Sequence, residues 1–280
     1  MATVIRPATG TDNPIQPEIE FVEVDGLNLR VAIRHGTGTP LLLFNGIGAN
    51  LELTMPFVDA FSGKEIIVFD MPGVGRSELG WRPRRFSGLA KLSARLLDRL
   101  GYPEVDVAGI SWGGAVAQQF AKRYPQRCRR LVLAATSAGT FMLPGGPRVL
   151  AKMATPKRYL SGRYMQEVAA TIYGGRVREN PDAIDGYASR IIPPNPLGYL
   201  YQLIGGLGWT SLLWLRSLKQ PTLVLGGDDD PLVPLINARF LASMIPNAQL
   251  HIVRGGGHLF LLYRTDEVVP VIREFLGAPE

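Results

Sequence analysis

The residues with the clearest chemical potential are Gly109-Ile110-Ser111-Trp112-Gly113, which lie between an apolar run and an amphipathic segment. Glycines two positions before and two positions after the serine permit the tight strand-to-helix turn that lifts a serine hydroxyl clear of a sheet. Because the chain has 32 glycines, the bare pattern also arises by chance, and the strand-turn-helix context carries the interpretation. The pattern predicts that Ser111 is a nucleophile.

A serine hydroxyl needs a base to remove its proton, and the chain offers only three histidines. Imidazole suits the task because it titrates near neutral pH. His258 ends a glycine-rich loop, residues 254–258, after the last expected strand, so it can reach the carboxyl edge of a sheet. His35 and His251 fall in expected strands, which indicates structural roles. We therefore expect His258 to be the base.

A carboxylate should orient that imidazole and stabilise its charged form. The loop that follows another expected strand begins Gly227-Asp228-Asp229-Asp230-Pro231 and brings three aspartates to one strand end. Spacing alone does not choose among them. Two of the three are expected to be turn residues or caps.

A tetrahedral intermediate also needs donors for its negative oxygen. The segment Phe44-Asn45-Gly46-Ile47-Gly48 follows the first expected parallel strand, where a second backbone amide of an oxyanion hole arises. We expect the backbone amides of Ile47 and Trp112 to be the donors. The alternative is that these glycines only turn the chain.

The hydrophobic pattern predicts the scaffold that positions these motifs. Runs 19–24 and 27–35 are joined by Asp25-Gly26, a favoured hairpin turn. Apolar runs then alternate with amphipathic segments, as in a parallel sheet buried on both faces. The expected fold is α/β, with a mostly parallel sheet and helices on both faces. Further strands are expected at 40–44, 65–69, 105–109, 130–135, 221–227 and 248–253, and helices near 53–62, 87–100, 113–124, 235–244 and from 266.

The alternation stops between Gly139 and Arg216, where helical pieces and Pro/Gly-rich connections replace it. Strands on both sides of this interruption are needed to complete one sheet, so an inserted lid explains it better than two independent domains. We expect residues 1–138 to form the first part of the core, 139–216 an inserted helical lid, and 217–280 the second part of the core.

Composition excludes several protein classes. With 280 residues, 46% hydrophobic and 19% charged, the chain can bury one full-sized core and is neither a small disulfide scaffold nor a disordered tail. A single cysteine, Cys128, is usual in a reducing cytosol. Residues 1–16 hold no apolar run of secretory length, and prolines interrupt the uncharged stretch 191–215. We expect a cytoplasmic protein without a transmembrane segment.

The motifs together resemble the α/β-hydrolase superfamily, in which the chain order is serine, acid, histidine. This resemblance spans nearly the whole chain. It rests on the run DMPGVGRS (70–77), the serine turn at 109–113, called the nucleophile elbow, the acid loop that begins at Gly227, and the Gly-His loop at 254–258. More closely, several segments are similar to intracellular medium-chain-length poly(3-hydroxyalkanoate) depolymerases. These segments are FNGIGANLEL (44–53), GISWGGAVAQQFA (109–121), LVLAAT (131–136), TIYGG (171–175), GLGWTS (206–211), LVLGGDDDPLVPLIN (223–237) and IPNAQLHI (245–252).

The resemblance implies particular roles and an activity. Asp230, the last residue of a glycine-x-x-Asp loop, maps to the orienting acid, with Ser111 as nucleophile and His258 as base. The implied reaction is hydrolysis of ester bonds in stored polyester, releasing 3-hydroxyalkanoate monomers or oligomers, with no metal or organic cofactor. The residues expected to contact substrate are Asn45, Tyr173, Trp209 and Leu259.

Two other functions stay open: a carboxylesterase or lactonase acting on small soluble esters, and a non-catalytic ligand-binding protein of the same fold. Ser111 argues against dehalogenases and epoxide hydrolases, which carry an aspartate at the elbow. Leu259 argues against carbon–carbon hydrolases, which typically have a tryptophan after the histidine. The loop from Asn45 differs from the His-Gly-Gly-Pro of prolyl aminopeptidases.

The formal net charge of +6 is concentrated in the expected lid. Residues 139–216 hold nine Lys or Arg and four Asp or Glu, whereas the rest holds 21 and 20. No basic, aromatic-interleaved module appears, so no nucleic-acid partner is expected. We hypothesise a basic, apolar face that docks on an anionic polyester-granule surface, the alternative being that the charges only solvate lid helices. Its basic residues would be Arg148, Lys152, Lys157, Arg158 and Arg163.

Overall fold

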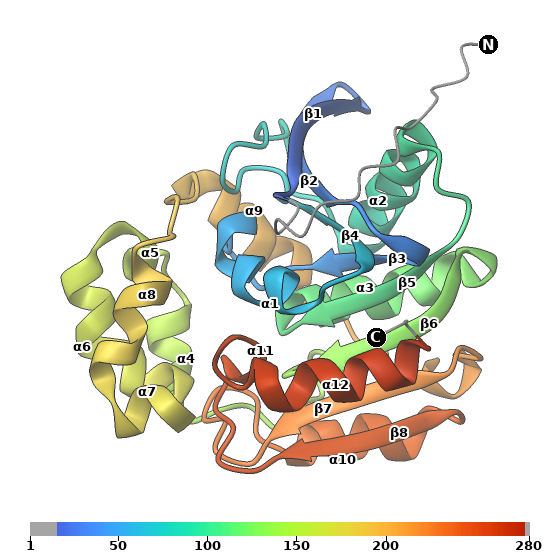
Figure 1. The fold of residues 1–280 in the computed structure, drawn as a ribbon. Helices are drawn as coiled ribbons and strands as arrows, with labels where there is room; N and C mark the ends of the chain where they lie inside the picture. Colours follow the sequence, from blue (N-terminus) through green and yellow to red (C-terminus); the bar gives the residue numbers. More distant parts are fainter. Residues whose placement is uncertain (1–15, 278–280) are drawn as a thin grey trace.

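One sheet of eight strands runs through the part of the chain that the computed structural model describes, residues 16–277 (Figure 1). The opening segment 1–15, for which no export signal is expected, lies outside the described residues. The strand order is β1-β2-β4-β3-β5-β6-β7-β8. The strands are β1 Glu18–Val24, β2 Leu27–Arg34, β3 Thr37–Phe44, β4 Lys64–Phe69, β5 Val105–Ile110, β6 Cys128–Ala134, β7 Thr222–Gly227 and β8 Ala248–Val253.

The sheet begins with the predicted antiparallel hairpin. Strands β1 and β2 pair up to Val24 and Leu27, and the two residues between them, Asp25 and Gly26, have φ of 54° and 73°. Positive φ at both central positions is the geometry of a tight hairpin turn that matches strand twist. Strand β2 also pairs antiparallel with β4, and the pairs from β4 to β8 along the strand order are parallel. The expected mostly parallel sheet is confirmed.

Helices cover both faces of this sheet, because alternate residues of each strand point to opposite sides. On β3, Leu42 and Phe44 join one buried cluster with α2, α3 and α10, whereas Leu41 and Leu43 join another with α1 and α12. The described helices of these two layers are α1 Met55–Ala60, α2 Phe86–Leu100, α3 Trp112–Arg123, α10 Ile236–Met244 and α12 Thr265–Leu276. The α/β class is therefore confirmed.

Between β6 and β7 the chain leaves the sheet, and we call residues 139–216 the insertion. It is helical, and Figure 1 shows α4 to α8 gathered at one side of the sheet. An isolated antiparallel bridge joins Gly139 to Thr210 near its two ends. Its elements are α4 Pro147–Met153, α5 Lys157–Leu160, α6 Gly162–Tyr173, α7 Gly175–Glu179, η3 Pro181–Ile184, α8 Asp185–Ala188, α9 Pro196–Gly206 and η4 Leu215–Ser217.

The insertion has its own buried apolar cluster, which also includes residues of the core. Met165, Val168 and Ile172 of α6 pack in it together with Ile47 of the loop after β3 and Leu232 of the loop after β7. The insertion is thus packed directly over loops at the carboxyl edge of the sheet. Within residues 16–277 no helix is long and apolar enough to cross a bilayer.

Candidate active site

Ser111 occupies a strained turn between β5 and α3. Its φ and ψ are 54° and −120°, a combination that residues other than glycine rarely adopt. The turn is held on both sides, because the Ser111 amide donates to the Ala134 carbonyl at 2.9 Å and the Gly114 amide donates to the Ser111 carbonyl at 2.9 Å. Strain retained by such contacts is common at functional residues.

The two glycines of the elbow are required by space. A Cβ at Gly109 would lie 2.5 Å from the Gly113 carbonyl oxygen, and a Cβ at Gly113 would lie 2.3 Å from the Phe44 carbonyl oxygen. Both distances are far below van der Waals contact. Strand β5, helix α3 and the end of β3 can therefore approach one another only with glycine at these positions.

His258 and Asp230 form a buried pair. His258 Nδ1 and Asp230 Oδ2 lie 2.8 Å apart, and the exposed fractions of the two side chains are 6% and 0%. The other carboxylate oxygen of Asp230 accepts from the amides of Leu232 and Val233, each at 2.9 Å. These three contacts fix the carboxylate and leave Nε2 of the imidazole to face the pocket that contains Ser111.

The three neighbouring aspartates, which spacing alone could not separate, have different contacts. Asp228 accepts from the Gly255 amide at 2.6 Å and so caps the loop that carries His258. Asp229 accepts from the Gly175 amide of the insertion at 2.6 Å and pairs with Arg178. Only Asp230 of the three reaches the imidazole.

The other two histidines and the cysteine are not part of this pair. His35 is half-exposed and contacts Glu18 at 2.9 Å, and His251 lies 3.6 Å from Glu267. Cys128 is buried, and burial raises the pKa of its thiol, which disfavours the reactive thiolate. Within residues 16–277 no group of three or more His, Cys, Asp or Glu side chains could hold a metal ion.

The two expected oxyanion donors come from the start of α3 and from the loop after β3. Trp112 is the first residue of α3, where a backbone amide has no acceptor inside the helix. In the loop after β3, the amide of Gly48 donates to Gln202 Oε1 at 2.7 Å and that of Ala49 to the Gly46 carbonyl at 3.2 Å. Among the described residues, no acceptor is found for the amide of Ile47, the residue before them.

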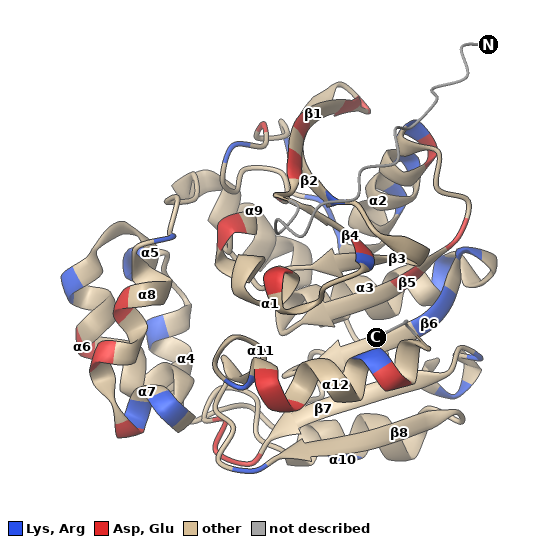
Figure 2. Ribbon diagram, viewed as in Figure 1, with Lys and Arg blue, Asp and Glu red and all other residues tan. Residues whose placement is uncertain are grey.

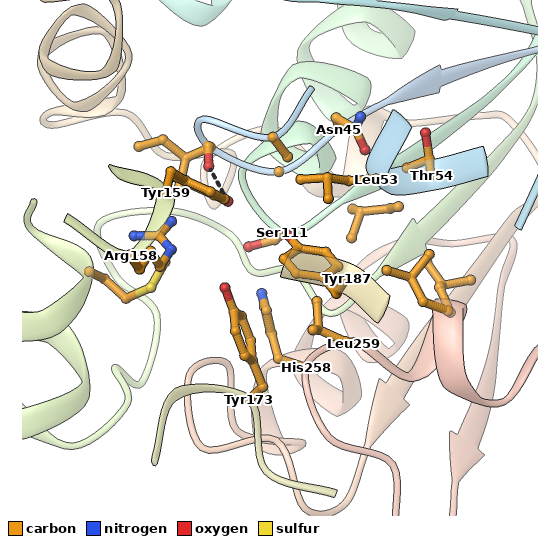
Figure 3. A pocket seen from close by; sticks show the side chains of 17 residues that line it. Asn45, Leu53, Thr54, Ser111, Arg158, Tyr159, Tyr173, Tyr187, His258 and Leu259 are labelled. Atoms are coloured by element: carbon orange, nitrogen blue, oxygen red, sulfur yellow. Dashed lines mark hydrogen bonds between the residues drawn. The ribbon is translucent and has the colours of Figure 1, made fainter. Parts of the chain in front are cut away.

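Ser111 and His258 line one pocket between the sheet edge and the insertion, and Figure 3 shows the imidazole directed toward Ser111. Three of the four expected substrate contacts, Asn45, Tyr173 and Leu259, line it as well. The remaining lining residues are Gly46, Ile47, Ala49, Leu53, Thr54, Ile110, Met153, Arg158, Tyr159, Tyr187, Leu261 and Leu262.

Trp209, the fourth expected contact, is not brought to this pocket. Its indole nitrogen donates to Gln119 Oε1 at 3.0 Å, and its ring packs edge-on against Phe86 and Trp214. The Trp209 carbonyl accepts from the Thr140 amide at 2.8 Å. Trp209 therefore anchors the base of the insertion on the helix layer of α2 and α3, a packing role that its residue type alone did not reveal.

The segment Tyr173-Gly174-Gly175 braces the histidine loop, which the sequence did not predict. The His258 amide donates to the Tyr173 carbonyl at 2.6 Å. A Cβ at Gly257 would lie 2.2 Å from that same carbonyl oxygen, and a Cβ at Gly175 would lie 2.4 Å from the Gly257 nitrogen. The insertion thus takes part in positioning His258.

Arg158 corrects one expectation. It was expected on an exposed basic face, but it is 1% exposed and lines the pocket. Its short helix α5 packs inward with Tyr159, so that Arg158 faces the interior while Lys157 remains exposed. Sequence composition reports the charge of a side chain but not the direction in which a four-residue helix presents it.

Comparisons with known proteins identify the family and fold of the chain. Residues 39–265 match the family model described as the alpha/beta hydrolase fold. A poly(3-hydroxyalkanoate) depolymerase of Ectopseudomonas oleovorans is 55% identical over 93% of each chain. A 2-hydroxymuconate semialdehyde hydrolase of Pseudomonas putida is 29% identical over 86% of this chain and 88% of its own. The crystal structure of an enol-lactonase from Burkholderia xenovorans superposes with a TM-score of 0.79 at 22% identity, covering 92% of this chain and all of the other. The chain belongs to the α/β-hydrolase family.

Proposed function

We propose that this member of the α/β-hydrolase family hydrolyses ester bonds of medium-chain-length poly(3-hydroxyalkanoate), releasing 3-hydroxyalkanoate monomers or oligomers. The observation that carries the proposal is the 55% identity to a poly(3-hydroxyalkanoate) depolymerase over 93% of the chain. The contacts of the candidate site supply the matching chemistry, since His258 is held by Asp230 and shares a pocket with Ser111.

In the proposed mechanism, Ser111 Oγ attacks the ester carbonyl carbon while His258 accepts the hydroxyl proton. The amides of Ile47 and Trp112 donate to the negative oxygen of the tetrahedral intermediate. His258 then delivers its proton to the departing alcohol, and an acyl-enzyme remains on Ser111. Water, deprotonated by the same imidazole, releases the acid. Asp230 keeps Nδ1 protonated and stabilises the imidazolium without accepting its proton.

The insertion, in this proposal, is a lid that shapes the substrate pocket. Most of the pocket wall is apolar or aromatic, which suits the aliphatic side chains of a medium-chain polyester. Met153, Tyr159 and Tyr187 come from the insertion, and Leu53, Leu259 and Leu262 come from the core. Asn45 lines the same pocket, and its amide group donates to the Asn50 carbonyl at 3.1 Å, which holds the loop after β3.

Docking on a polyester granule is proposed for the outer face of the insertion. Figure 2 shows Lys and Arg on α4 to α7. On α4 and α5, exposed Arg148 and Lys157 alternate with Leu150 and Leu160, which are 40% and 52% exposed. A basic face with exposed leucines suits a hydrophobic particle with an anionic coat. Arg158 is not part of this face, because it is buried.

A carboxylesterase or lactonase acting on small esters is the competing activity. It is supported by the small, largely buried pocket, which accepts a compact ester as readily as the end of a polymer. Both activities would use the same candidate triad. They differ in the preferred substrate.

Parallel assays separate the two. We expect the purified protein to clear a medium-chain-length poly(3-hydroxyalkanoate) latex and release 3-hydroxyalkanoates, whereas Ser111→Ala lowers this turnover by about four to six orders of magnitude. Turnover of a short p-nitrophenyl ester without any attack on the latex would favour the small-ester activity. Latex clearing by Ser111→Ala at the wild-type rate would refute the assignment of the nucleophile.

A further inference from the structure

The pocket wall contains one permanent charge, Arg158, and no carboxylate. Arginine stays protonated in proteins, so its guanidinium brings a full positive charge into the interior. Among residues 16–277, no Asp or Glu forms an ion pair with it. A buried charge is normally paired, because burial removes the water that stabilises it.

The contacts of Arg158 hold it in place but leave donor capacity unused. One terminal nitrogen, Nη1, donates to the Tyr199 hydroxyl at 2.9 Å and to the Thr155 carbonyl at 3.4 Å, and that hydroxyl donates in turn to the Met153 carbonyl at 2.7 Å. The guanidinium carbon lies 4.4 Å from the centre of the Tyr159 ring. The Nε atom is buried and has no hydrogen-bond partner among the described residues. Figure 3 shows the guanidinium reaching into the pocket from the side of the insertion.

Buried aromatic side chains surround Arg158 in the pocket wall. Tyr159, Tyr173 and Tyr187 line this region, and each is less than 10% exposed. A polymer chain could not continue past these side chains without displacing them. The part of a substrate that lies here must therefore be a chain end.

We infer that Arg158 binds the free carboxylate of the terminal 3-hydroxyalkanoate unit, so that cleavage proceeds from the carboxyl end of the polyester. An oriented guanidinium with unused donors fits a carboxylate, which can accept two parallel hydrogen bonds. This inference rests on the proposed ester hydrolysis. In each cycle Ser111 Oγ forms a bond to the penultimate carbonyl carbon, and the bond from that carbon to the 3-oxygen of the terminal unit breaks. That oxygen takes its proton from His258, and the monomer leaves with its carboxylate.

Two dimers of 3-hydroxyoctanoate test the inference: one with a free terminal carboxylate and one capped there as a primary amide. For the wild-type protein we expect kcat/KM for the internal ester to be about 10- to 100-fold higher with the free acid, the range that one hydrogen-bonded charge pair supports. Arg158→Gln should remove this preference by a loss on the free acid alone. Arg158→Lys, which keeps the charge without the planar fork, should retain part of it.

Arg216→Gln is the matched control, because Arg216 lies on the same insertion, is exposed and does not line the pocket. Its kcat/KM for both dimers should equal that of the wild-type protein. Equal kcat/KM of the wild-type protein for the two dimers, or an Arg158→Gln variant that keeps the preference, would overturn the inference. If thermal unfolding shows that Arg158→Gln does not fold, Arg158→Lys decides the test. A ratio of kcat/KM, free acid over amide, equal to that of the wild-type protein would then count against the inference. Failure of the wild-type protein to cleave either dimer would instead contradict the proposed function.

Product order on the polymer gives a second readout that needs no variant. Cleavage from the carboxyl end releases monomers from the earliest sampled time, and amidation of the polymer carboxyl ends should slow this release about tenfold or more. Early release of long oligomers, or equal rates for capped and free polymer, would contradict cleavage from that end.

Discussion

At the residue scale, Asp230 is separated from its neighbours by its contacts. It alone reaches the His258 imidazole, while Asp228 caps the adjacent loop through the Gly255 amide. An aspartate that fixes the imidazole tautomer contributes to catalysis through that contact, whereas a loop cap contributes only to local stability. The two positions therefore form a matched pair for mutagenesis.

We expect Asp230→Asn to lower kcat for ester hydrolysis by about 10⁴-fold, because the amide no longer holds the productive tautomer of His258. Asp228→Asn should stay within about tenfold of the wild-type kcat, because the loop cap is weakened but the imidazole keeps its partner. Steady-state kinetics on a p-nitrophenyl ester measures both. The assignment of the orienting acid would be wrong if Asp228→Asn were the more damaged variant.

How far the sequence predicts the site depends on the kind of residue. The elbow and the histidine loop could be found because their chemistry requires glycines at fixed offsets and a rare residue type. Sequence spacing could not choose among three aspartates, because the fold of the loop after β7 decides which carboxylate reaches the His258 imidazole. Two side chains lie elsewhere than expected: Trp209 packs against α2 and α3 instead of lining the pocket, and Arg158 lines the pocket instead of an exposed face. Only tertiary structure sets the direction in which such side chains point.

At the element scale, the insertion and the histidine loop form one unit. The Tyr173 carbonyl accepts from the His258 amide at 2.6 Å, and the adjacent glycine backbones touch. The order of strands and helices was predictable, since continuous apolar runs and amphipathic periods mark them. This docking was not, because it depends on backbone groups that leave no pattern in the side chains.

Gly257→Ala tests the docking, since its Cβ would lie 2.2 Å from the Tyr173 carbonyl oxygen. Displacing the loop by even part of an ångström should lower kcat by about 10²-fold, and the overpacking should lower the free energy of unfolding by about 1 to 3 kcal/mol. Gly146→Ala is the control, because its Cβ would meet nothing within 4 Å. Kinetics and denaturant unfolding of both variants give the comparison, and wild-type kcat in Gly257→Ala would show that the contact does not position His258.

At the scale of the whole molecule, the net charge of +6 resides mainly on the insertion, the part that would meet a polyester surface. One basic residue of the expected docking face, Arg158, belongs instead to the pocket. Burial thus divides the positive charge between an outer face, proposed for docking, and an interior group, proposed to bind substrate. Neither use requires a change in the sheet that positions Ser111.

Neutralising the outer basic residues should weaken binding to a polyester latex coated with an anionic phospholipid, while turnover of a p-nitrophenyl ester stays within about twofold. Higher salt should weaken wild-type binding in the same way, because the attraction is screened. Latex co-sedimentation measures both effects. The tested set is Arg148, Lys152, Lys157 and Arg163, and the control set, from other exposed parts of the chain, is Lys91, Arg99, Lys219 and Arg239. Equal loss in both sets would contradict a localised docking face.

The central claim, a serine acyl-enzyme formed from 3-hydroxyalkanoate esters, is tested most directly by trapping that intermediate. The dimer of 3-hydroxyoctanoate is mixed with the protein, and the mixture is quenched in acid within milliseconds to seconds, digested and analysed by peptide mass spectrometry. We predict a 3-hydroxyoctanoyl adduct on the peptide that contains Ser111, and no adduct on that peptide in Ser111→Ala. Dimer turnover without an adduct on Ser111, or with an adduct on another residue, would contradict the account.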